Sequence, residues 1–326
     1  MQALRCHAFG PIANLVVEDI PAPPPGAGEV LIDVHAASIN YPDTLMVQGL
    51  YQVKPPLPFT PGAELAGVVV AVGDGVRHVK VGDRVAASTG TGAFAQQAVA
   101  EASRVMPLPA GMSFDAGASF VLAYGTSIHA LRTIARLQPG ETLLVLGAAG
   151  GVGIAAVQIA KAMGARVIAA ASSDAKRALA REAGADETVD YTQAEWRREV
   201  ERLTAGKGAD VVYDAVGGAY AEPALRATAW RGRYLVVGFA AGEIPKLPLN
   251  LALLKERAIL GVFWGAAMAR EPKQLLADLQ QLAGWFAEGR VTPPVTEQVP
   301  LAGAADAMTR LATRQAMGKL VVRPRD

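Results

Sequence analysis

The sequence predicts an α/β protein in which a β-rich, barrel-like domain accompanies a doubly wound parallel sheet. Two patterns predict this class. Residues 1–123 carry short β-type segments separated by proline and glycine turns, as compact β domains do. Residues 124–263 alternate strand-type and helix-type segments, which is typical of a parallel sheet covered by helices. Because residues 264–326 return to mixed character, we expect them to complete the β-rich domain, with residues 124–263 as the second domain.

The first region owes its β character to four segments. They lie at residues 29–40, 64–76, 81–88 and 92–100. Prolines cluster at residues 21–29 and 54–62. Since proline lacks the N–H that a central strand must donate, these two stretches are predicted loops.

The second region contains five strand-type segments with helical segments between them. The strands are predicted at residues 142–147, 166–172, 187–191, 209–217 and 232–239. After the second strand, the pattern predicts a helix with Asp174 as N-cap and Gly184 as C-cap. Further along the chain, residues 271–289 form a long amphipathic helical pattern and residues 316–324 a final strand.

The composition excludes several classes of protein. Lys and Arg total 31 against 30 Asp and Glu, so no excess charge favours nucleic acid or an acidic membrane surface. The start MQALRCHAFG lacks the apolar core of a secretion signal, and no uncharged apolar run approaches the roughly 20 residues that span a bilayer. Cys6 is the single cysteine, which excludes an intrachain disulfide and a cysteine-cluster zinc site. We therefore expect a cytoplasmic enzyme that binds neither nucleic acid nor membranes.

A glycine-rich turn follows the strand at residues 142–147 and leads into a helix. It nearly matches G-x-G-x-x-G, except that Ala148 occupies the first glycine position. In a dinucleotide-binding turn, glycines permit the bend, let the pyrophosphate approach the backbone and let helix and strand pack closely. Gly150, Gly151 and Gly153 can supply these functions, while the small Ala148 can still make the turn. The helix beginning near Val152 would point its N–H groups at the pyrophosphate. The alternative is a glycine-rich connection without a ligand, which the surrounding β-α units disfavour.

The end of the second strand of this region indicates which dinucleotide would bind. NAD-binding proteins usually place Asp or Glu there for the ribose hydroxyl, whereas this chain has Ser172 and Ser173. Lys176 and Arg177 lie one turn into the next helix, and Tyr191 ends the third strand as a further hydroxyl donor. Since these groups suit a 2′-phosphate, we expect NADPH rather than NADH. The alternative is that the two cations are ordinary solvated surface residues, and Asp174 weakens the case for a phosphate.

Several segments in the same order resemble the medium-chain dehydrogenase/reductase superfamily over essentially the whole chain, and within it the zinc-free, zeta-crystallin-like quinone oxidoreductases. The matching segments are ASINYPDTLMVQGLY, PFTPGAELAGVVVAVG, VGDRVA, GTSIHAL, LGAAGGVGIAAVQIAKAMGA and GRYLVVGF. The resemblance implies a GroES-like β-barrel domain, a Rossmann domain, a cleft between them and a homodimer. The sheet edge near residues 256–263 is a candidate dimer surface.

The motif that binds metal in zinc-dependent members of this superfamily is altered here. Those alcohol dehydrogenases carry G-H-E-x-x-G and a ligand cysteine, whereas this chain has GAELAG at Gly62–Gly67 with Ala63 at the histidine position. No cysteine is available for the other ligand position, so we expect no metal site. Glu64 remains, and we interpret it as a structural hydrogen-bonding residue rather than a base.

The resemblance also implies a chemistry. Family members transfer hydride from NADPH to quinones or to the β-carbon of α,β-unsaturated carbonyl compounds. Tyr51 matches the tyrosine that donates a proton in the related enoyl-thioester reductases, and Asn40 matches the asparagine near the nicotinamide in the quinone-reductase branch. A tyrosine hydroxyl can stabilise and protonate the anion that hydride addition creates. Alternatively, Tyr51 packs a loop and Asn40 caps a turn; Tyr41 is a second tyrosine of the same segment.

Four further residues are predicted to lie near the cofactor. Thr126 matches a family threonine, although a helix N-cap is an equally ordinary use for it. Gly238 and Phe239 end the strand predicted at residues 232–239, at the carboxyl edge of the sheet. Phe263 and the adjacent Trp264 either line the cleft or fill the domain interface.

The leading hypothesis is an NADPH-dependent reductase of quinones or enones. A rival within the same class is an enoyl-thioester reductase for acyl-CoA, which needs cations at the cleft mouth such as Lys54, Arg270 and Lys273. A rival from another class is a non-catalytic cofactor-binding or RNA-binding protein, for which the near-zero net charge gives no support.

Overall fold

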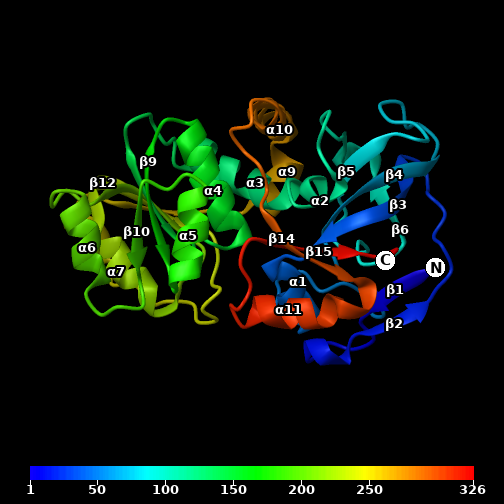
Figure 1. The fold of residues 1–326 in the computed structure, drawn as a ribbon, viewed down its shortest axis with the longest axis horizontal. Coiled ribbons are helices and arrows are strands. Elements are labelled where there is room, and N and C mark those ends of the chain that lie inside the picture. The colour runs from blue at the N-terminus through cyan, green and yellow to red at the C-terminus, as the bar shows by residue number, and fades with distance from the viewer. The chain divides into compact units, whose positions relative to one another are not determined.

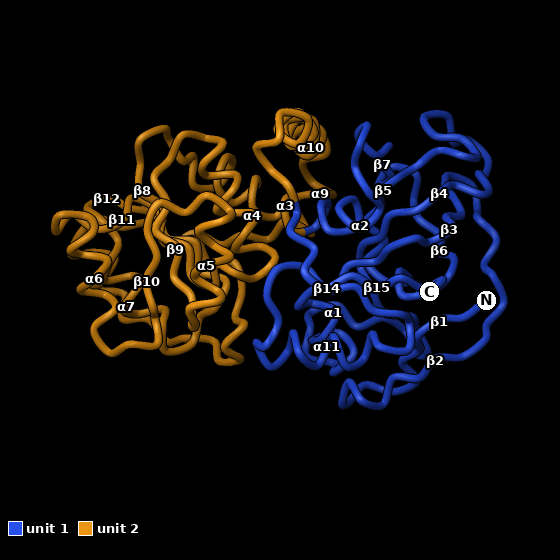
Figure 2. Tube along the Cα trace, viewed as in Figure 1, with its two compact units in different colours: residues 1–122, 293–326 blue, residues 123–292 orange.

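A computed structural model describes residues 1–326 and divides into two compact units (Figure 2). Unit 1 contains Met1–Leu122 and Pro293–Asp326, and unit 2 contains Ala123–Thr292. The second break therefore follows Thr292 rather than residue 263, where the sequence pattern placed it.

Packing explains why residues 264–292 belong to unit 2. A Cβ built on Gly125 would lie 2.5 Å from the Trp264 ring, so the indole sits directly against this glycine. Farther along, Arg132 and Asp278 form an ion pair with an N–O distance of 3.1 Å. Tertiary contacts of this kind leave no periodic signature in the sequence, which is why the pattern misplaced the break.

Unit 1 is the predicted β-rich domain, and its main sheet runs in the order β14-β15-β3-β4-β5-β7, with β6 also paired to β3 (Figure 1). The strands of this unit are β1 (Gln2–Arg5), β2 (Val16–Asp19), β3 (Glu29–Ser38), β4 (Glu64–Val72), β5 (Arg84–Ser88), β6 (Gln97–Glu101), β7 (Val105–Pro107), β14 (Val295–Pro300) and β15 (Lys319–Arg323). The pairs within the main sheet are antiparallel except for β14 with β15. The final strand β15 pairs with β3, so the two ends of the chain build one sheet.

Three short α-helices accompany this sheet. They are α1 (Tyr41–Val47), α2 (Phe114–Ala118) and α11 (Ala304–Ala312). Helix α1 buries Met46 and Val47, and α11 buries Ala307 and Met308, in the same apolar core as the β strands. This core holds α1 at the end of β3, where two candidate site residues lie.

Unit 2 is built on six parallel strands in the order β10-β9-β8-β11-β12-β13. The strands are β8 (Thr142–Leu146), β9 (Arg166–Ala171), β10 (Glu187–Asp190), β11 (Ala209–Asp214), β12 (Thr228–Val236) and β13 (Ala258–Gly261). Residues Leu143–Leu146 of β8 are fully buried, as expected for a strand covered on both faces. The predicted doubly wound sheet is confirmed.

Helices cover this sheet between its strands. They include α3 (Val121–Ile128), α4 (Gly151–Ala162), α5 (Asp174–Glu182), α6 (Trp196–Leu203), α7 (Ala221–Arg226), α8 (Asn250–Leu253), α9 (Trp264–Arg270) and α10 (Pro272–Ala287). One face of the sheet packs against Trp196 and Val200 of α6 and Leu225 of α7. None of the helices is at once long enough and apolar enough to cross a membrane.

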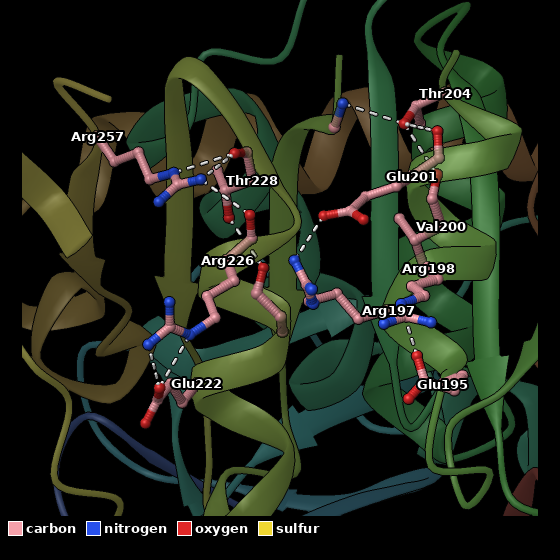
Figure 3. Close-up of polar contacts among 12 residues, drawn as sticks. Glu195, Arg197, Arg198, Val200, Glu201, Thr204, Glu222, Arg226, Thr228 and Arg257 are labelled. Carbon is pink, nitrogen blue, oxygen red and sulfur yellow. Dashed lines mark hydrogen bonds and ion pairs between the residues drawn. The ribbon is translucent and has the colours of Figure 1, made fainter. Parts of the chain in front are cut away.

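A buried arginine ties α7, β12 and α8 together. The Arg257 side chain donates hydrogen bonds to the backbone carbonyls of Arg226 and Thr228 at 2.7–3.0 Å (Figure 3). It also donates to the Leu251 carbonyl at 3.0 Å. These carbonyls lie at ends of helices and strands, where no partner within the same element is available. Nearby, α6 and α7 carry ion pairs such as Arg197–Glu201 and Arg226–Glu222 on their surfaces (Figure 3).

Candidate active-site elements

The glycine turn between β8 and α4 has the geometry of a close strand–helix crossing. A Cβ built on Gly153 would lie 2.2 Å from the Gly147 carbonyl oxygen, so only glycine fits there. The left-handed residue of the turn is Gly147, with a φ of +71°. Ala148, which the sequence motif placed at the bend, is instead fully buried. The bend thus falls one residue earlier than predicted, because the motif fixes spacing but not which peptide turns over.

Gly150 is the N-cap of α4, and its position leaves open space for a ligand. A Cβ there would meet only the Gly147 oxygen, at 3.4 Å. Helix α4 then begins at Gly151, so Gly151, Val152 and Gly153 form its first turn. Backbone N–H groups in the first turn of a helix have no partner within the helix, and they attract anions. The turn therefore suits a pyrophosphate.

The sequence did not indicate two hydrogen-bond networks, one bonded to the first turn of α4 and one at the end of the neighbouring strand β11. Ser127 of α3 donates to the Val152 carbonyl at 2.9 Å and lies 3.0 Å from the Tyr213 hydroxyl. Asp214, at the end of β11, accepts from the N–H groups of Val216 and Gly217 at 2.8 Å, and the Tyr234 hydroxyl is hydrogen-bonded to its other oxygen. Burial raises the pKa of the Asp214 carboxyl. These partners lie on separate β-α units, so no local motif could have found them.

Thr126, next to Ser127, lies inside helix α3 and is half-buried. Its alternative use as a helix N-cap is therefore wrong. The proposed position near the cofactor stays a prediction.

At the end of β9, the four residues predicted to select the cofactor differ in how they are held. Ser173, not Asp174, is the N-cap of α5, and its hydroxyl accepts from the Lys176 N–H at 3.3 Å. The Lys176 ammonium lies 3.5 Å from the Ser172 hydroxyl. Arg177 is largely buried between two acids, at 3.0 Å from Asp190 and 2.6 Å from Asp174. Asp174 thus pairs with Arg177, and the Lys176 ammonium lies beside Ser172.

Tyr191 follows β10 and lies beneath the surface, with its ring centroid 4.5 Å from that of Tyr220.

Gly238 and Phe239 lie in the loop after β12, where the Gly238 N–H donates to the Asp214 carbonyl oxygen at 3.2 Å. Phe239 packs against Gly217, whose Cβ would lie 2.8 Å from the phenyl ring. Phe263 precedes α9 with its side chain about half exposed. The structure therefore places Gly238 and Phe239 in contact with the loop that follows Asp214.

Unit 1 contains a buried polar cluster at the start of α1. Asn40 is the N-cap of this helix and is 6% exposed. Its amide nitrogen donates to the Glu64 carboxylate at 2.9 Å and to the Ser38 carbonyl at 3.2 Å. Its amide oxygen accepts from the Lys319 ammonium at 2.7 Å.

Glu64 and Lys319 complete the cluster as a buried ion pair at 3.2 Å. The second Glu64 oxygen accepts from the Leu122 N–H at 2.8 Å. Glu64 is therefore a fully buried hydrogen-bonding residue, as the sequence analysis expected. The partner that sequence reasoning missed is Lys319, because 255 residues separate it from Glu64.

Tyr51 lies after α1, half-buried against the core of unit 1. Burial, and secondarily the nearby Asp43 carboxylate, raise the pKa of the Tyr51 phenol. Asp43 accepts from the Asn40 backbone N–H at 2.8 Å through one oxygen, while its other oxygen is buried without a hydrogen bond. Burial raises the pKa of Asp43 to about 7. The structure thus groups Asn40 and Tyr51 at the two ends of α1, with Asp43 between them.

Lys54, Arg270 and Lys273, the cations considered for an acyl-CoA, are all exposed. Lys54 belongs to unit 1 and the other two to unit 2.

Family models match both units. The alcohol dehydrogenase GroES-like domain matches residues 26–110. The zinc-binding dehydrogenase family matches residues 151–281, which begin in the first turn of α4 and include the ends of β9 and β12.

Individual proteins match over nearly the whole chain. A quinone oxidoreductase of Pseudomonas aeruginosa is 38% identical over 324 residues, which covers 98% of this chain and 99% of that protein. A quinone oxidoreductase-like protein 2 homolog of Nematostella vectensis is 37% identical, over 98% of this chain and 88% of its own length. The crystal structure of Escherichia coli quinone oxidoreductase complexed with NADPH is similar with a TM-score of 0.92 and 30% identity, and covers 99% of this chain and 100% of that one.

Proposed function

We propose that this chain, which belongs to the zinc-free, zeta-crystallin-like quinone oxidoreductase family of the medium-chain dehydrogenases/reductases, uses NADPH to reduce a quinone or an α,β-unsaturated carbonyl compound. The chain is an oxidoreductase of this family, and the proposal concerns its substrate. The observation that carries the proposal is the turn from Gly147 to Gly153. Because Gly153 has no Cβ, the first turn of α4 can lie directly against the end of β8.

NADPH fits the residues present in unit 2. The backbone N–H groups of Gly151, Val152 and Gly153 would hold the pyrophosphate, beside Ala148 and Gly150. When bound, NADPH supplies a hydride from its reduced nicotinamide. Thr126, Gly238, Phe239 and Phe263 are proposed to shape the nicotinamide end.

Lys176 is the proposed partner of the 2′-phosphate, together with the hydroxyls of Ser172, Ser173 and Tyr191. Arg177 is engaged by Asp190 and Asp174, so its charge is largely offset. A single cation with hydroxyl donors still favours a phosphate over a free ribose hydroxyl.

On the acceptor side, Tyr51 is the proposed proton donor. Hydride addition to the β-carbon of an enone leaves an enolate, and the Tyr51 O–H would donate its proton to that anion. Because the pKa of Tyr51 is raised, its phenol is protonated at neutral pH and available as an acid. The tyrosinate then regains a proton from solvent, to which the half-buried side chain has access.

We propose that the reaction needs no metal. The position of the superfamily's zinc-ligand histidine is Ala63, and Glu64 is saturated by Asn40, Leu122 and Lys319. Polarisation of the acceptor is therefore assigned to hydrogen bonding rather than to a Lewis acid.

The test is NADPH oxidation by the purified protein with an ortho-quinone, a short enone and crotonyl-CoA, each with and without EDTA. We expect turnover of the quinone or the enone, unchanged by EDTA. Faster turnover of crotonyl-CoA would favour the enoyl-thioester reductase. Inactivity with all three, combined with tight NADPH binding, would favour the non-catalytic cofactor-binding protein.

A further inference from the structure

Lys319 is a charged residue of the α1 cluster to which the proposed reaction gives no function. Its side chain is 3% exposed and its partner Glu64 is fully buried. Removing two charges from water is unfavourable, and a buried ion pair is often no more stabilising than apolar residues of the same volume. Stability alone is therefore a weak explanation for this pair.

The backbone places Lys319 where it can act on Asn40. Lys319 begins β15, and the pairing of Val321 with Ser38 sets β15 beside the end of β3. The Ile39 N–H donates to the Leu320 carbonyl at 3.0 Å. The lysine side chain thus arises from a rigid sheet and meets the Asn40 amide oxygen at 2.7 Å.

Asn40 is held at every polar atom of its side chain. Both N–H groups have acceptors, on Glu64 and Ser38, and the oxygen accepts from Lys319. Its backbone N–H is bonded to Asp43 of α1. The side chain is consequently fixed in one orientation, and through it the first turn of α1 is fixed to β4 and β15.

We propose that Lys319 is a positioning residue for the reduction: held by Glu64, it fixes Asn40 at the start of α1 and so sets the place of Tyr51 after the end of that helix. This inference rests on the proposed function, since it assigns Tyr51 to the acceptor. A displacement of about 1 Å at a reacting group can lower a rate by up to about 100-fold. Loss of the Lys319–Asn40 hydrogen bond should therefore lower kcat. It would leave NADPH binding unchanged, because the dinucleotide turn is held by other residues, in unit 2.

The test compares Lys319→Met, Lys319→Arg and the double variant Lys319→Met/Glu64→Gln with the wild type. The double variant removes both charges and keeps one acceptor oxygen, which can serve Asn40, while the new amide nitrogen takes the place of the oxygen that accepts from Leu122. Because no buried charge is left unpaired, its melting temperature should recover part of the loss caused by Lys319→Met alone. We expect kcat in the double variant to remain at least about 10-fold below wild type, with the Kd for NADPH within twofold of wild type. Lys319→Arg, which keeps a donor for Asn40, should recover part of kcat.

Two results would overturn the proposal. If kcat recovers in the folded double variant, Lys319 only neutralises the charge of Glu64 and does not position Asn40 for the reaction. A rise in the Kd for NADPH that parallels the fall in kcat would place its effect on the cofactor instead. Failure of the proposed function is read separately, from the wild type alone, as inactivity with both quinone and enone.

Discussion

Gly153 leaves no room for a methyl group, because a Cβ at this position would lie 2.2 Å from the Gly147 oxygen and 2.8 Å from the Ala148 Cα. Both obstacles are backbone atoms of the turn, which cannot move without shifting the start of α4. We expect Gly153→Ala to raise the Kd for NADPH at least about 10-fold and to destabilise the protein by about 2 kcal/mol. Fluorescence titration with NADPH and thermal unfolding measure the two effects.

The control for this substitution is Gly284→Ala. Gly284 is exposed within α10 and has open space around its Cβ position, so alanine should stabilise the helix by about 0.5–1 kcal/mol. Normal NADPH binding by Gly153→Ala would mean that the close contact between β8 and α4 at Gly153 is not needed to bind the cofactor.

Tyr51 and Tyr41 lie in the same segment, yet only Tyr51 has Asp43 among the groups that raise its pKa. Tyr51→Phe removes the proposed proton and keeps the ring that packs on the core. We expect kcat with an enone to fall about 100-fold or more, with little change in the Kd for NADPH. Tyr41→Phe is the matched control and should leave both values within about twofold. An unaltered enone rate in Tyr51→Phe would end its assignment as the acid.

Asp43 makes stability depend on pH in a direction opposite to that of a salt-bridged carboxylate. Its pKa is raised from 3.8 to about 7 in the folded chain, so between about pH 4 and 7 the folded state holds a proton that the unfolded state has lost. Stability from this residue is present at low pH and lost as the pH rises through that window. Asp43→Asn cannot ionise, so the wild type should lose up to a few kcal/mol relative to the variant between about pH 4 and 7.

Urea unfolding of both proteins across this range measures that difference. Lowered pKa values of Asp186 and Asp190 act in the opposite direction in both proteins, so they cancel in the comparison. A difference that stays constant with pH would mean that Asp43 is ionised in the folded chain throughout.

At the scale of elements, the carboxyl end of β9 and the first turn of α5 form one phosphate-binding segment. Lys176 lies beside Ser172, whereas Arg177 is bound to Asp190 after the neighbouring strand β10. We expect Lys176→Ala to raise the Kd for NADPH about 10-fold or more, consistent with the loss of one charge-assisted hydrogen bond. Binding of NADH, which lacks the phosphate, should change less than twofold.

Arg181→Ala, on the next turn of α5, is the control for a general loss of positive charge. Its guanidinium is bonded to Thr188, and it should leave the ratio of the two dissociation constants unchanged. Equal losses of NADPH and NADH binding in Lys176→Ala would refute the contact with the 2′-phosphate.

At the scale of the whole molecule, periodicity predicted the two architectures well, and the comparisons with relatives confirm the predicted fold class. The misplaced domain break and the missed Lys319 share a physical cause, since both concern contacts between residues distant in sequence. Trp264 packs on Gly125, which keeps α9 in unit 2, and nothing in the local pattern signals this contact. Lys319 reaches Glu64 across 255 residues and reads as an ordinary charge in a terminal strand.

Errors within one turn have a second cause. Ser173 rather than Asp174 caps α5, and Gly147 rather than Ala148 makes the bend before α4. In both places neighbouring residues are chemically suited to the same task, so the sequence allows either position. The orientation of a single peptide decides an element boundary of this kind, and the residue pattern does not specify that orientation.

The homodimer that the family resemblance implies is proposed to form at the outer edge of the parallel sheet. Strand β13 ends the sheet order with no neighbour beyond it, and its Ile259 and Leu260 are only partly buried. Leu253 and Leu254 just before it are 76% and 60% exposed. An open edge beside exposed apolar side chains is a surface that natural proteins cover, and a second copy placed by twofold symmetry covers both edges at once.

We therefore expect light scattering to give twice 33.9 kDa for the wild type. Leu253→Glu/Leu254→Glu places two charges on this surface without touching the core, and it should yield a folded monomer. Leu276→Glu is the control, because Leu276 is similarly exposed, at 58%, on the separate helix α10, and this variant should stay dimeric. A monomeric wild type would mean that the edge of β13 faces solvent. A double variant that remains dimeric would mean the same, because two buried glutamates in a stable interface would be strongly unfavourable.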